Sequence, residues 1–288
     1  MFPSTKPVSN RIAIVFDFDE TLVPESFKVL LEHFNLDAEE FNQNRVYKLV
    51  NEGWQKVPAR AYSLIEESKQ RNDAEKITQS RIAEFGRNLE PFPGVPQMFD
   101  RLRECARNIV PDVEVEFYLI TGGFVEIARH TSIANQFTAM WGCEFSYDKN
   151  GGIEFLKQIM THTEKTRYLF HISKGIDRNN DKDLVFLYQD IPGEELHVPL
   201  TQTIYVGDGT SDIPCFTVMN EHHGIAIGLY KDKTTEEWEH ANEVQANQQV
   251  ANLAPPDYSP DSELMRSLVL AVESISKQIA LRALSVNK

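Results

Sequence analysis

Residues 14 to 26 read IVFDFDETLVPES and place two aspartates, Asp17 and Asp19, one residue apart after a run of β-branched and aromatic residues. The run RIAIVF at residues 11 to 16 is typical of a short strand that is buried on both faces. Two carboxylates this close repel each other, so the pKa of each would rise unless a cation lies beside them. The stretch therefore predicts a buried strand that ends at a cation site.

Two further apolar runs have the same design. Residues 115–120, VEFYLI, are followed by TGGF, and residues 203–206, TIYV, are followed by GDGTSD. The carboxyl ends of parallel strands meet at the edge of an open sheet where ligands bind. We therefore predict an α/β fold with a three-layer, Rossmann-like parallel sheet and a site at that edge.

The stretch between the first two strands has a different pattern. Apolar residues recur there at helical spacing, beginning with Phe27, Leu30, Leu31 and Phe34. We expect residues 24–88 to form a small helical cap domain inserted after the first strand. Residues 1–23 and 89–288 would then form one discontinuous core domain.

The rest of the chain offers several local signals. An apolar stripe that begins at Val95 behind a Pro/Gly boundary predicts a helix, and an Asn-Gly pair within residues 143–155 predicts a β-hairpin. HTEKTRYLFHISK reads as a helix that Gly175 stops, and Glu263 to about Leu284 reads as an amphipathic helix on the core. Residues 176–200 are polar and irregular, and the sequence assigns them no role.

The composition limits the classes of molecule that this protein is expected to bind. The 288 residues are 41% hydrophobic, as expected of a globular protein, and 29 basic against 43 acidic residues give a net charge of −14. This average field repels nucleic acids and acidic membranes, so we expect neither as a partner. A bound phosphate would need local positive charge.

The cysteines and the lengths of the apolar runs indicate the cellular compartment in which the protein is expected. Cys105, Cys143 and Cys215 are widely spaced, which argues against a disulfide framework or a zinc site and favours buried thiols in a reducing cytosol. No apolar run approaches the roughly 18 to 20 residues that span a bilayer. We expect a cytoplasmic protein.

Asp208 and Asp212, in GDGTSD, bring two more carboxylates to the predicted site edge. A cluster of acidic oxygens with few nitrogen or sulfur donors suits Mg²⁺. The stretch lacks the residue spacing of an EF-hand calcium loop. The four aspartates therefore favour a magnesium site.

Four motifs in this order resemble the haloacid dehalogenase-like (HAD) phosphatases, in particular the phosphoserine phosphatase branch. They are DFDET, TGG after a strand, Lys165 at a helix start, and GDGTSD. The resemblance covers about residues 11 to 230. Each motif alone is weak, since aspartates and glycines are common in turns, but four in the correct order are strong.

The resemblance implies a role for each carboxylate of the first motif. Asp17 would be the nucleophile that forms an aspartyl-phosphate, and Asp19 would be the general acid and base. One intervening residue puts both side chains on the same side of an extended segment, so both can reach one phosphoryl group. The alternative for this pair is an ordinary turn or cap.

The remaining motifs would bind the phosphate and the metal. Mg²⁺ would be held by Asp17, the backbone carbonyl of Asp19, Asp208 and Asp212. The phosphoryl oxygens would be bound by the hydroxyl of Thr121, the amide of Gly122 and the ammonium of Lys165. A lysine at a helix amino terminus opposes the helix dipole, so only a nearby anion explains Lys165, unless it is a solvated surface lysine.

The substrate is less defined. The phosphoserine phosphatases have a substrate-binding glutamate nine positions after the nucleophile, where this chain has Ser26; Glu25 is the nearest acid. We therefore expect a small phosphorylated metabolite, with Glu25, Arg45 and Arg60 as candidate contacts. The cap aromatics Phe27, Phe34 and Trp54 are interpreted as the core of the cap rather than as a substrate box.

Two other functions stay open at this point. A phosphotransferase or mutase on the same fold would pass the phosphoryl group to an acceptor, and a non-catalytic protein would only bind a phosphorylated ligand. The sequence does not define the oligomeric state.

Overall fold

A central sheet organises the computed structural model, which describes residues 9–176, 189, 191–209, 211–230 and 250–286. Within these residues the sheet has seven strands in the order β4-β3-β2-β1-β5-β6-β7. The strands are β1 (Arg11–Phe16), β2 (Glu114–Phe124), β3 (Ala139–Tyr147), β4 (Ile153–Gln158), β5 (Thr203–Gly207), β6 (Ile225–Leu229) and β7 (Asn252–Ala254). All neighbouring pairs are parallel except β3 and β4, which form the predicted antiparallel hairpin.

Strand β1 lies at the centre of the sheet, between β2 and β5, and its residues from Ile12 onward are buried. Its last residue, Phe16, is in register with Leu119 of β2 and Val206 of β5. The three predicted strands are thus confirmed, and their carboxyl ends do share one edge. Strand β2 is longer than predicted, because it continues through TGGF after a register shift that follows Ile120.

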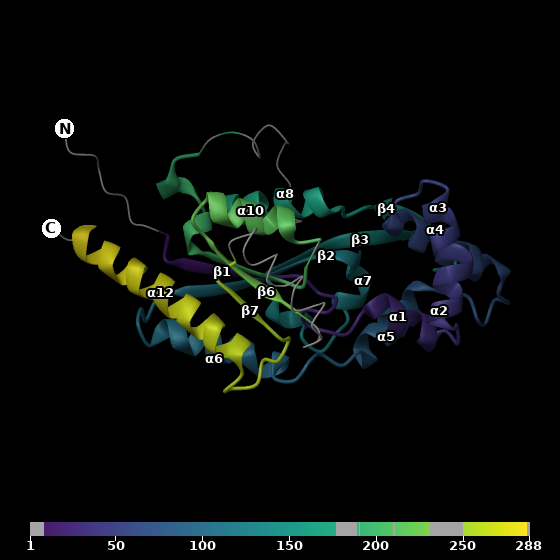
Figure 1. Ribbon diagram of the computed structural model, residues 1–288, viewed down its shortest axis with the longest axis horizontal. Coiled ribbons are helices and arrows are strands. Elements are labelled where there is room, and N and C mark those ends of the chain that lie inside the picture. Colours follow the sequence, from purple (N-terminus) through teal and green to yellow (C-terminus); the bar gives the residue numbers. More distant parts are fainter. Residues whose placement is uncertain (1–8, 177–188, 190, 210, 231–249, 287–288) are drawn as a thin grey trace.

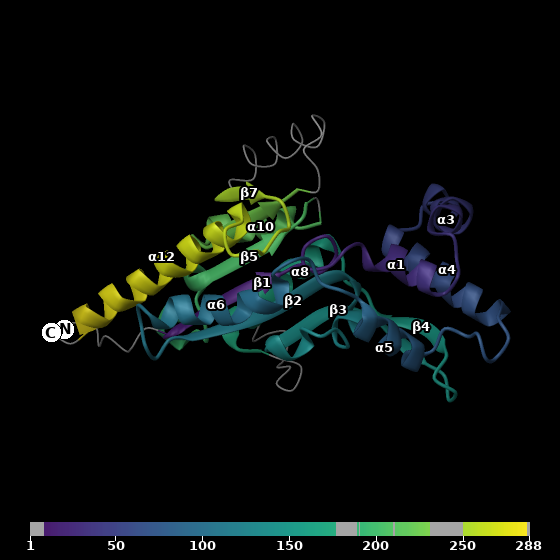
Figure 2. The same cartoon turned by 90° about the horizontal axis from the view of Figure 1, so that it is seen from below.

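Helices cover both faces of the sheet (Figures 1 and 2). Helices α8 (His162–Lys174) and α10 (Ile213–Glu221) lie on one face, and α6 (Val95–Arg107) and α12 (Glu263–Val286) lie on the other. Short elements connect these parts: α7 (Val125–Ala128), η2 (Ala134–Gln136), η3 (Gly193–Glu195) and η4 (Leu200–Gln202). The three-layer α/β fold and the three predicted helices are confirmed, and Gly175 ends α8 with a φ of 68°.

The segment between β1 and β2 is helical, as predicted. It contains α1 (Ser26–His33), α2 (Ala38–Phe41), the π-helix η1 (Asn42–Val46), α3 (Tyr47–Asn51), α4 (Lys56–Gln70) and α5 (Gln79–Asn88). Figure 1 shows these helices gathered at one end of the molecule, and we call them the cap helices. Phe27 and Phe34 are buried among them, but Trp54 is 40% exposed and packs on Tyr62, so its assignment to the cap core was wrong. The division of the chain into two domains stays a prediction.

The hairpin of β3 and β4 ties the cap helices to the sheet. The turn before β4 meets the segment between α4 and α5 through a β-bridge that joins Thr78 to Gly152. The amide of Gln79 donates to the carbonyl of Gly151 at 2.8 Å, and the amide of Ile153 donates to the carbonyl of Ile77 at 3.1 Å. The cap helices are therefore anchored at a third point besides their two chain connections.

The structure also bears on the predictions for the three cysteines, for membrane-spanning helices and for residues 176–200. Cys143 and Cys215 are buried and Cys105 is half-buried, all as free thiols. Across the described parts of the chain, no helix has the length and apolar character needed to cross a bilayer. Most of the segment 176–200, to which the sequence assigned no role, lies outside the described residues. Its described part contains η3 and ends where η4 begins.

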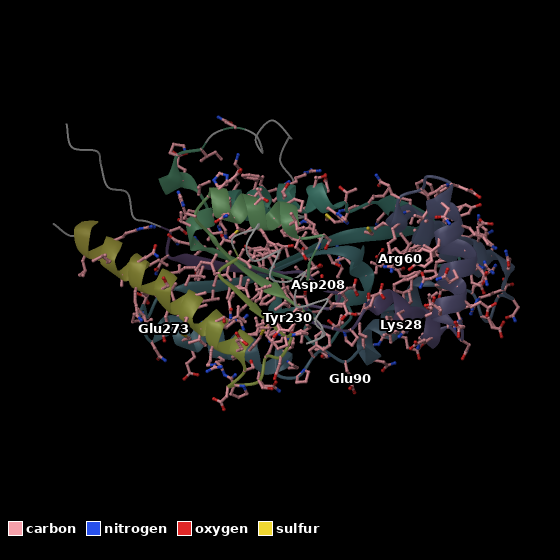
Figure 3. All side chains as sticks on the ribbon, in the orientation of Figure 1. Lys28, Arg60, Glu90, Asp208, Tyr230 and Glu273 are labelled. Carbon is pink, nitrogen blue, oxygen red and sulfur yellow. The ribbon has the colours of Figure 1, made fainter. Side chains whose placement is uncertain are left out.

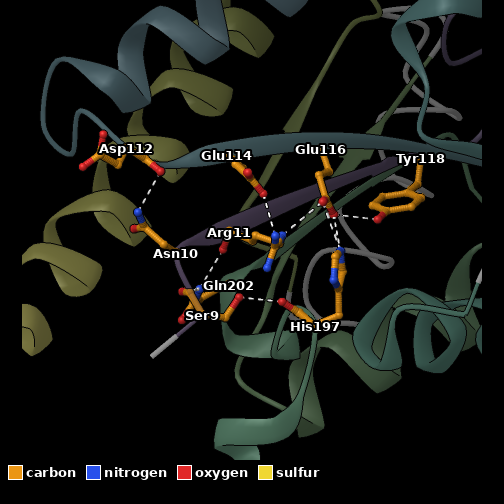
Figure 4. Close-up of polar contacts among 9 residues, drawn as sticks. All are labelled: Ser9, Asn10, Arg11, Asp112, Glu114, Glu116, Tyr118, His197 and Gln202. Atoms are coloured by element: carbon orange, nitrogen blue, oxygen red, sulfur yellow. Dashed lines mark hydrogen bonds and ion pairs between the residues drawn. The ribbon is translucent and has the colours of Figure 1, made fainter. Parts of the chain in front are cut away.

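A polar cluster joins the amino-terminal ends of the central strands (Figure 4). The guanidinium of Arg11 contacts Glu114 at 2.8 Å and Glu116 at 3.3 Å. Glu116 also contacts His197 at 2.8 Å and accepts from the hydroxyl of Tyr118 at 2.6 Å. Burial alone would raise the pKa of Glu116, but these donors and the charge of Arg11 outweigh it and lower the pKa below 4.5.

We predict that Glu116→Gln lowers the free energy of unfolding by about 1 kcal/mol at pH 7, because it weakens the charge-assisted hydrogen bonds. A lowered carboxyl pKa contributes stability above the unfolded pKa and loses it as the pH falls through the folded pKa. The gap between wild type and variant should therefore close below about pH 4.5, as measured by urea unfolding. Glu114→Gln, on the same strand but 60% exposed, is the control and should change little; a gap that persisted at low pH would contradict the assignment.

Candidate active site

Asp17 is the first residue after β1, at the carboxyl edge of the sheet. Its amide donates to the carbonyl of Val206 at 2.9 Å, which continues the pairing of β1 with β5 past the end of the strand. Its carboxylate is 4% exposed, and one oxygen accepts from the amide of Phe18 at 2.7 Å. The sheet therefore fixes the backbone of Asp17 while its side chain faces the site.

Lys165 lies directly opposite Asp17 and is 1% exposed. Helix α8 has Thr161 as its N-cap, whose hydroxyl accepts from the amide of Glu164, and Lys165 follows one residue later. The Nζ atom donates to Oδ2 of Asp17 at 2.8 Å and to Oδ1 of Asp212 at 2.7 Å. The third donor of the ammonium reaches Oγ of Ser211 at 3.2 Å, so the site rather than solvent accounts for this lysine.

The electrostatics of this bridge follow from burial and charge. Burial lowers the pKa of Lys165, but the carboxylates of Asp17 and Asp212 outweigh that effect and raise it, so the lysine is protonated. Burial raises the pKa of Asp17; Lys165 opposes this shift, while the charges of Asp212 and Asp208 reinforce it. A cation beside these carboxylates would relieve their repulsion.

Three of the four predicted metal ligands come together. Asp17, Asp208 and Asp212 each offer a carboxylate oxygen, and these oxygens lie within 4.8 Å of one another. Lys165 contacts two of the three residues, and Asp208, the first residue after β5, brings a further acidic oxygen. A set of hard oxygen donors of this kind fits Mg²⁺.

Asp19 lies beside this cluster, and its carboxylate contacts the loop that follows β1. Its Oδ1 accepts from the amide of Ser26 at 2.6 Å, and its Oδ2 lies where a side chain on Gly123 would reach, 2.5 Å from the position of a Cβ. Burial raises the pKa of Asp19, although the hydrogen bonds from Ser26 lower it in part. A raised pKa favours a carboxyl group that can donate a proton near neutral pH.

Thr121 lies at the same edge and is fully buried. Its hydroxyl oxygen accepts from the amide of Gly123 at 2.9 Å, which leaves the hydroxyl proton free to be donated. The predicted neighbour, Gly122, also lines the site. All four residues of TGGF therefore line the same cavity as Asp17.

Sequence reasoning missed several supports of this site. Ser26 stands where the family has its substrate-binding glutamate, yet it binds Asp19, and Gly123 provides the space for that carboxylate. Tyr258, from the segment before α12, donates its hydroxyl to the carbonyl of Thr21 at 3.0 Å and so holds the loop that follows β1. A buried tyrosine needs a partner, but the sequence gives no signal that this partner lies 237 residues away.

A cavity of about 490 Å³ opens over these residues, between the sheet edge and the cap helices. Figure 3 shows Asp208 on the sheet side and Arg60 on the side of the cap helices. Side chains that line the cavity include Asp17, Asp19, Thr121, Lys165 and Asp208 from the sheet side, Glu25, Phe27, Lys56 and Arg60 from the cap side, and Phe216, Leu229, Tyr230 and Leu253 from the side of β6 and β7. The size is that of a site for a small molecule.

Of the three candidate substrate contacts, Glu25 and Arg60 line the cavity and Arg45 does not. Arg60 pairs with Glu25 and stacks over the ring of Phe27 at 4.7 Å, and all three line the cavity. Phe27 is therefore part of the cavity wall as well as of the cap core. Arg45 instead pairs with Glu67 at 2.8 Å and is not among the residues that line the cavity, so the structure does not support it as a substrate contact.

Comparison with solved structures identifies the fold. A HAD family hydrolase from Salmonella enterica serovar Typhi matches with a TM-score of 0.58, 13% identity, 93% of this chain and 72% of its own. A protein from Vibrio cholerae described as a probable phosphoserine phosphatase matches with a TM-score of 0.57, 15% identity, 95% of this chain and 68% of its own. The chain has the HAD hydrolase fold.

The resemblance drawn from the four motifs is thus confirmed at the level of the fold. No protein-family model matches the HAD-like chain. An uncharacterized protein of Borreliella burgdorferi is 25% identical over 235 residues, which are 73% of this chain and 79% of that protein. At such identities the comparisons establish the fold, while the chemistry depends on the geometry of the site.

We predict that Lys165→Met lowers the free energy of unfolding by about 3–5 kcal/mol in the presence of a chelator, because the variant leaves two buried carboxylates without their cation. Urea unfolding followed by circular dichroism measures the change. Lys69→Met is the matched control, since Lys69 pairs with Glu66 on the surface of α4 and is 61% exposed; it should cause no measurable loss. Equal stability of the two variants would show that the bridge does not hold the site together.

Proposed function

We propose that this protein is a Mg²⁺-dependent phosphatase that hydrolyses a small phosphomonoester through an aspartyl-phosphate on Asp17. The observation that carries the proposal is the meeting of four distant motifs around one cavity, where Lys165 joins Asp17 to Asp212 beside Asp208. A structural turn or cap would not require a buried lysine between two buried carboxylates. The proteins of similar fold include one described as a hydrolase and one described as a probable phosphoserine phosphatase, which supports this proposal.

In the first step, a carboxylate oxygen of Asp17 attacks the phosphorus atom of the substrate. The bond from phosphorus to the leaving oxygen breaks, and Asp19 as a carboxylic acid gives its proton to that oxygen, so that an alcohol departs. Burial raises the pKa of Asp19 and favours the acid that this step needs. Lys165 holds the Asp17 carboxylate in place for the attack.

In the second step, Asp19 is a carboxylate and takes a proton from water. The water oxygen bonds to phosphorus, the bond between phosphorus and Asp17 breaks, and inorganic phosphate is released. Both steps use the same pair of side chains, which accounts for their separation by one residue. The bond from Ser26 to Asp19 keeps the carboxyl group on the cavity side of the loop.

Thr121, Gly122 and Lys165 would surround the phosphoryl oxygens. The hydroxyl of Thr121 has a proton to donate, and Gly122 lines the same cavity. Asp17, Asp208, Asp212 and the carbonyl of Asp19 would hold Mg²⁺, which neutralises charge on the phosphoryl group when bound.

The side of the cavity formed by the cap helices would select the leaving group. Arg60 and Glu25 place one positive and one negative charge about the opening, which suits a small polar metabolite that carries charged groups of its own. With Ser26 in place of a glutamate, we do not propose phosphoserine itself. The net charge of −14 supports a small metabolite rather than a nucleic acid or a membrane lipid. The three free thiols support a cytoplasmic setting.

A phosphotransferase or mutase is the second candidate. It would use Asp17 and Asp19 in the same first step and then pass the phosphoryl group to an acceptor alcohol in place of water. The width of the cavity is compatible with an acceptor. In that case, product analysis would show a phosphorylated acceptor and little free phosphate.

We predict that purified protein releases phosphate from members of a phosphomonoester panel with Mg²⁺, and that excess chelator abolishes release. Asp17→Asn should reduce the rate at least about a thousandfold, because an amide is not a nucleophile for this step. The readout is free phosphate, with phosphorylated acceptors scored in parallel. Asp100→Asn, an exposed aspartate on α6, is the control and should leave the rate unchanged.

Release of phosphate by Asp17→Asn at the wild-type rate would remove Asp17 as nucleophile. No turnover of any panel member by the wild type, together with specific binding of one of them, would favour a non-catalytic phosphate-binding protein.

We predict that Arg60→Leu raises KM for the best panel substrate about tenfold and changes kcat less, because Arg60 lines the cavity from the cap helices and donates its hydrogen bond to Glu25 rather than to Asp17 or Asp19. Arg45→Leu is a matched control, since Arg45 also pairs with a glutamate and stacks over a phenylalanine ring but lies outside the cavity. Steady-state kinetics of both variants provides the measurement. Equal effects on KM would indicate that Arg60 acts on the cap rather than on the substrate.

A further inference from the structure

Tyr205 lies in the middle of β5, with its side chain directed at the carboxylate cluster. Its side chain is fully buried, and its hydroxyl donates to Oδ1 of Asp212 at 2.6 Å. We propose that Tyr205 is a positioning residue that holds Asp212 in the orientation needed for Mg²⁺ binding and turnover. This inference rests on the proposed function and adds a residue to its machinery.

The strand geometry explains how Asp212 reaches Tyr205. Tyr205 and Gly207 are two residues apart on β5, so they face the same side of the sheet. The Asp212 carboxylate lies over Gly207, where a Cβ would stand 2.5 Å from Oδ2. The absence of a side chain at residue 207 therefore lets the carboxylate descend to the tyrosine hydroxyl.

Asp212 gives up a local interaction for this contact. It occupies the N-cap position of α10, where an aspartate normally accepts a hydrogen bond from the helix amides, but its side chain makes no such bond. Its Oδ1 instead accepts from Tyr205 and from Lys165 at 2.7 Å. A residue that departs from a local rule in this way is usually held by a functional site.

Two donors on one oxygen fix the rotation of the carboxyl group. The ring of Tyr205 is itself held against Phe216 of α10, with ring centroids 5.8 Å apart at 79°. Tyr205 and Lys165 thus bind Asp212 directly, and Phe216 holds the ring of Tyr205 in place. Without the tyrosine hydroxyl, Oδ1 would keep only the bond from Lys165 among the described residues, and Oδ2 would keep the long bond of 3.4 Å from the hydroxyl of Ser211.

The neutrality of the hydroxyl is also significant. A second lysine at this place would hold Asp212 equally well, but its charge would repel a divalent cation from the carboxylates. Tyrosine donates a hydrogen bond without adding positive charge. Groups that orient a metal ligand in this way typically contribute 10- to 100-fold to metal affinity or activity.

The test is Tyr205→Phe, which removes one oxygen atom and keeps the ring. We expect calorimetric titration to show Mg²⁺ binding at least about tenfold weaker than in wild type. With a panel substrate, kcat should fall by a similar factor and KM should stay within about twofold, because Tyr205 does not line the cavity.

Tyr118→Phe is the matched control. Tyr118 is also a buried tyrosine whose hydroxyl donates to a carboxylate, that of Glu116, at 2.6 Å, but its partner belongs to the polar cluster at the other end of the strands. Both variants should lose similar stability, and only Tyr205→Phe should lose Mg²⁺ affinity. Wild-type Mg²⁺ affinity in Tyr205→Phe, or its failure to fold where Tyr118→Phe folds, would overturn the positioning role.

A double variant separates action through Asp212 from other effects. If Tyr205 acts through Asp212, adding Tyr205→Phe to Asp212→Asn should weaken Mg²⁺ binding by less than twofold further. Full additivity would overturn the proposal. Mg²⁺ titration needs no turnover, so wild-type protein that bound Mg²⁺ but released no phosphate would refute the proposed activity while the comparison of variants still decided the role of Tyr205.

Discussion

The ammonium group of Lys165 lies between the carboxylates of Asp17 and Asp212, and the rest of the site depends on these three buried charges. Each is expensive to bury alone, and removal of any one would leave the others uncompensated. The interaction therefore demands that β1, α8 and the start of α10 keep their relative positions. In return, it holds the first carboxylate in one place, which an attack on phosphorus requires.

The sheet meets this demand through its order. With β1 at the centre and β5 beside it, the carboxyl ends of both strands deliver Asp17 and the loop of Asp208 to the same edge. Helices α8 and α10 pack side by side on one face, so Lys165 and Asp212 approach from that face. Glycines at 123 and 207 then let Asp19 and Asp212 lie closer to the backbone than any other residue would allow.

The cap helices and the end of the chain complete the site from outside the motifs. The hairpin of β3 and β4 anchors the cap helices near the cavity, and Arg60 with Glu25 adds charge to its cap side. Tyr258 supports the loop after β1 from the segment before α12. In the proposed mechanism the chemistry is concentrated at the sheet edge, and the cap helices select the leaving group.

The sequence by itself determined the fold class, the three central strands, the helical insert and the residues of the four motifs, because hydrophobic period and strand-end chemistry are local properties of the chain. It also favoured an anion beside Lys165 over a solvated surface position, since a helix amino terminus disfavours a lysine. Only the tertiary structure decided that Ser26 binds Asp19, that Arg45 lies outside the cavity and that Tyr205 reaches Asp212. These contacts depend on how distant segments pack and on which face a side chain takes, and a linear pattern does not encode either one.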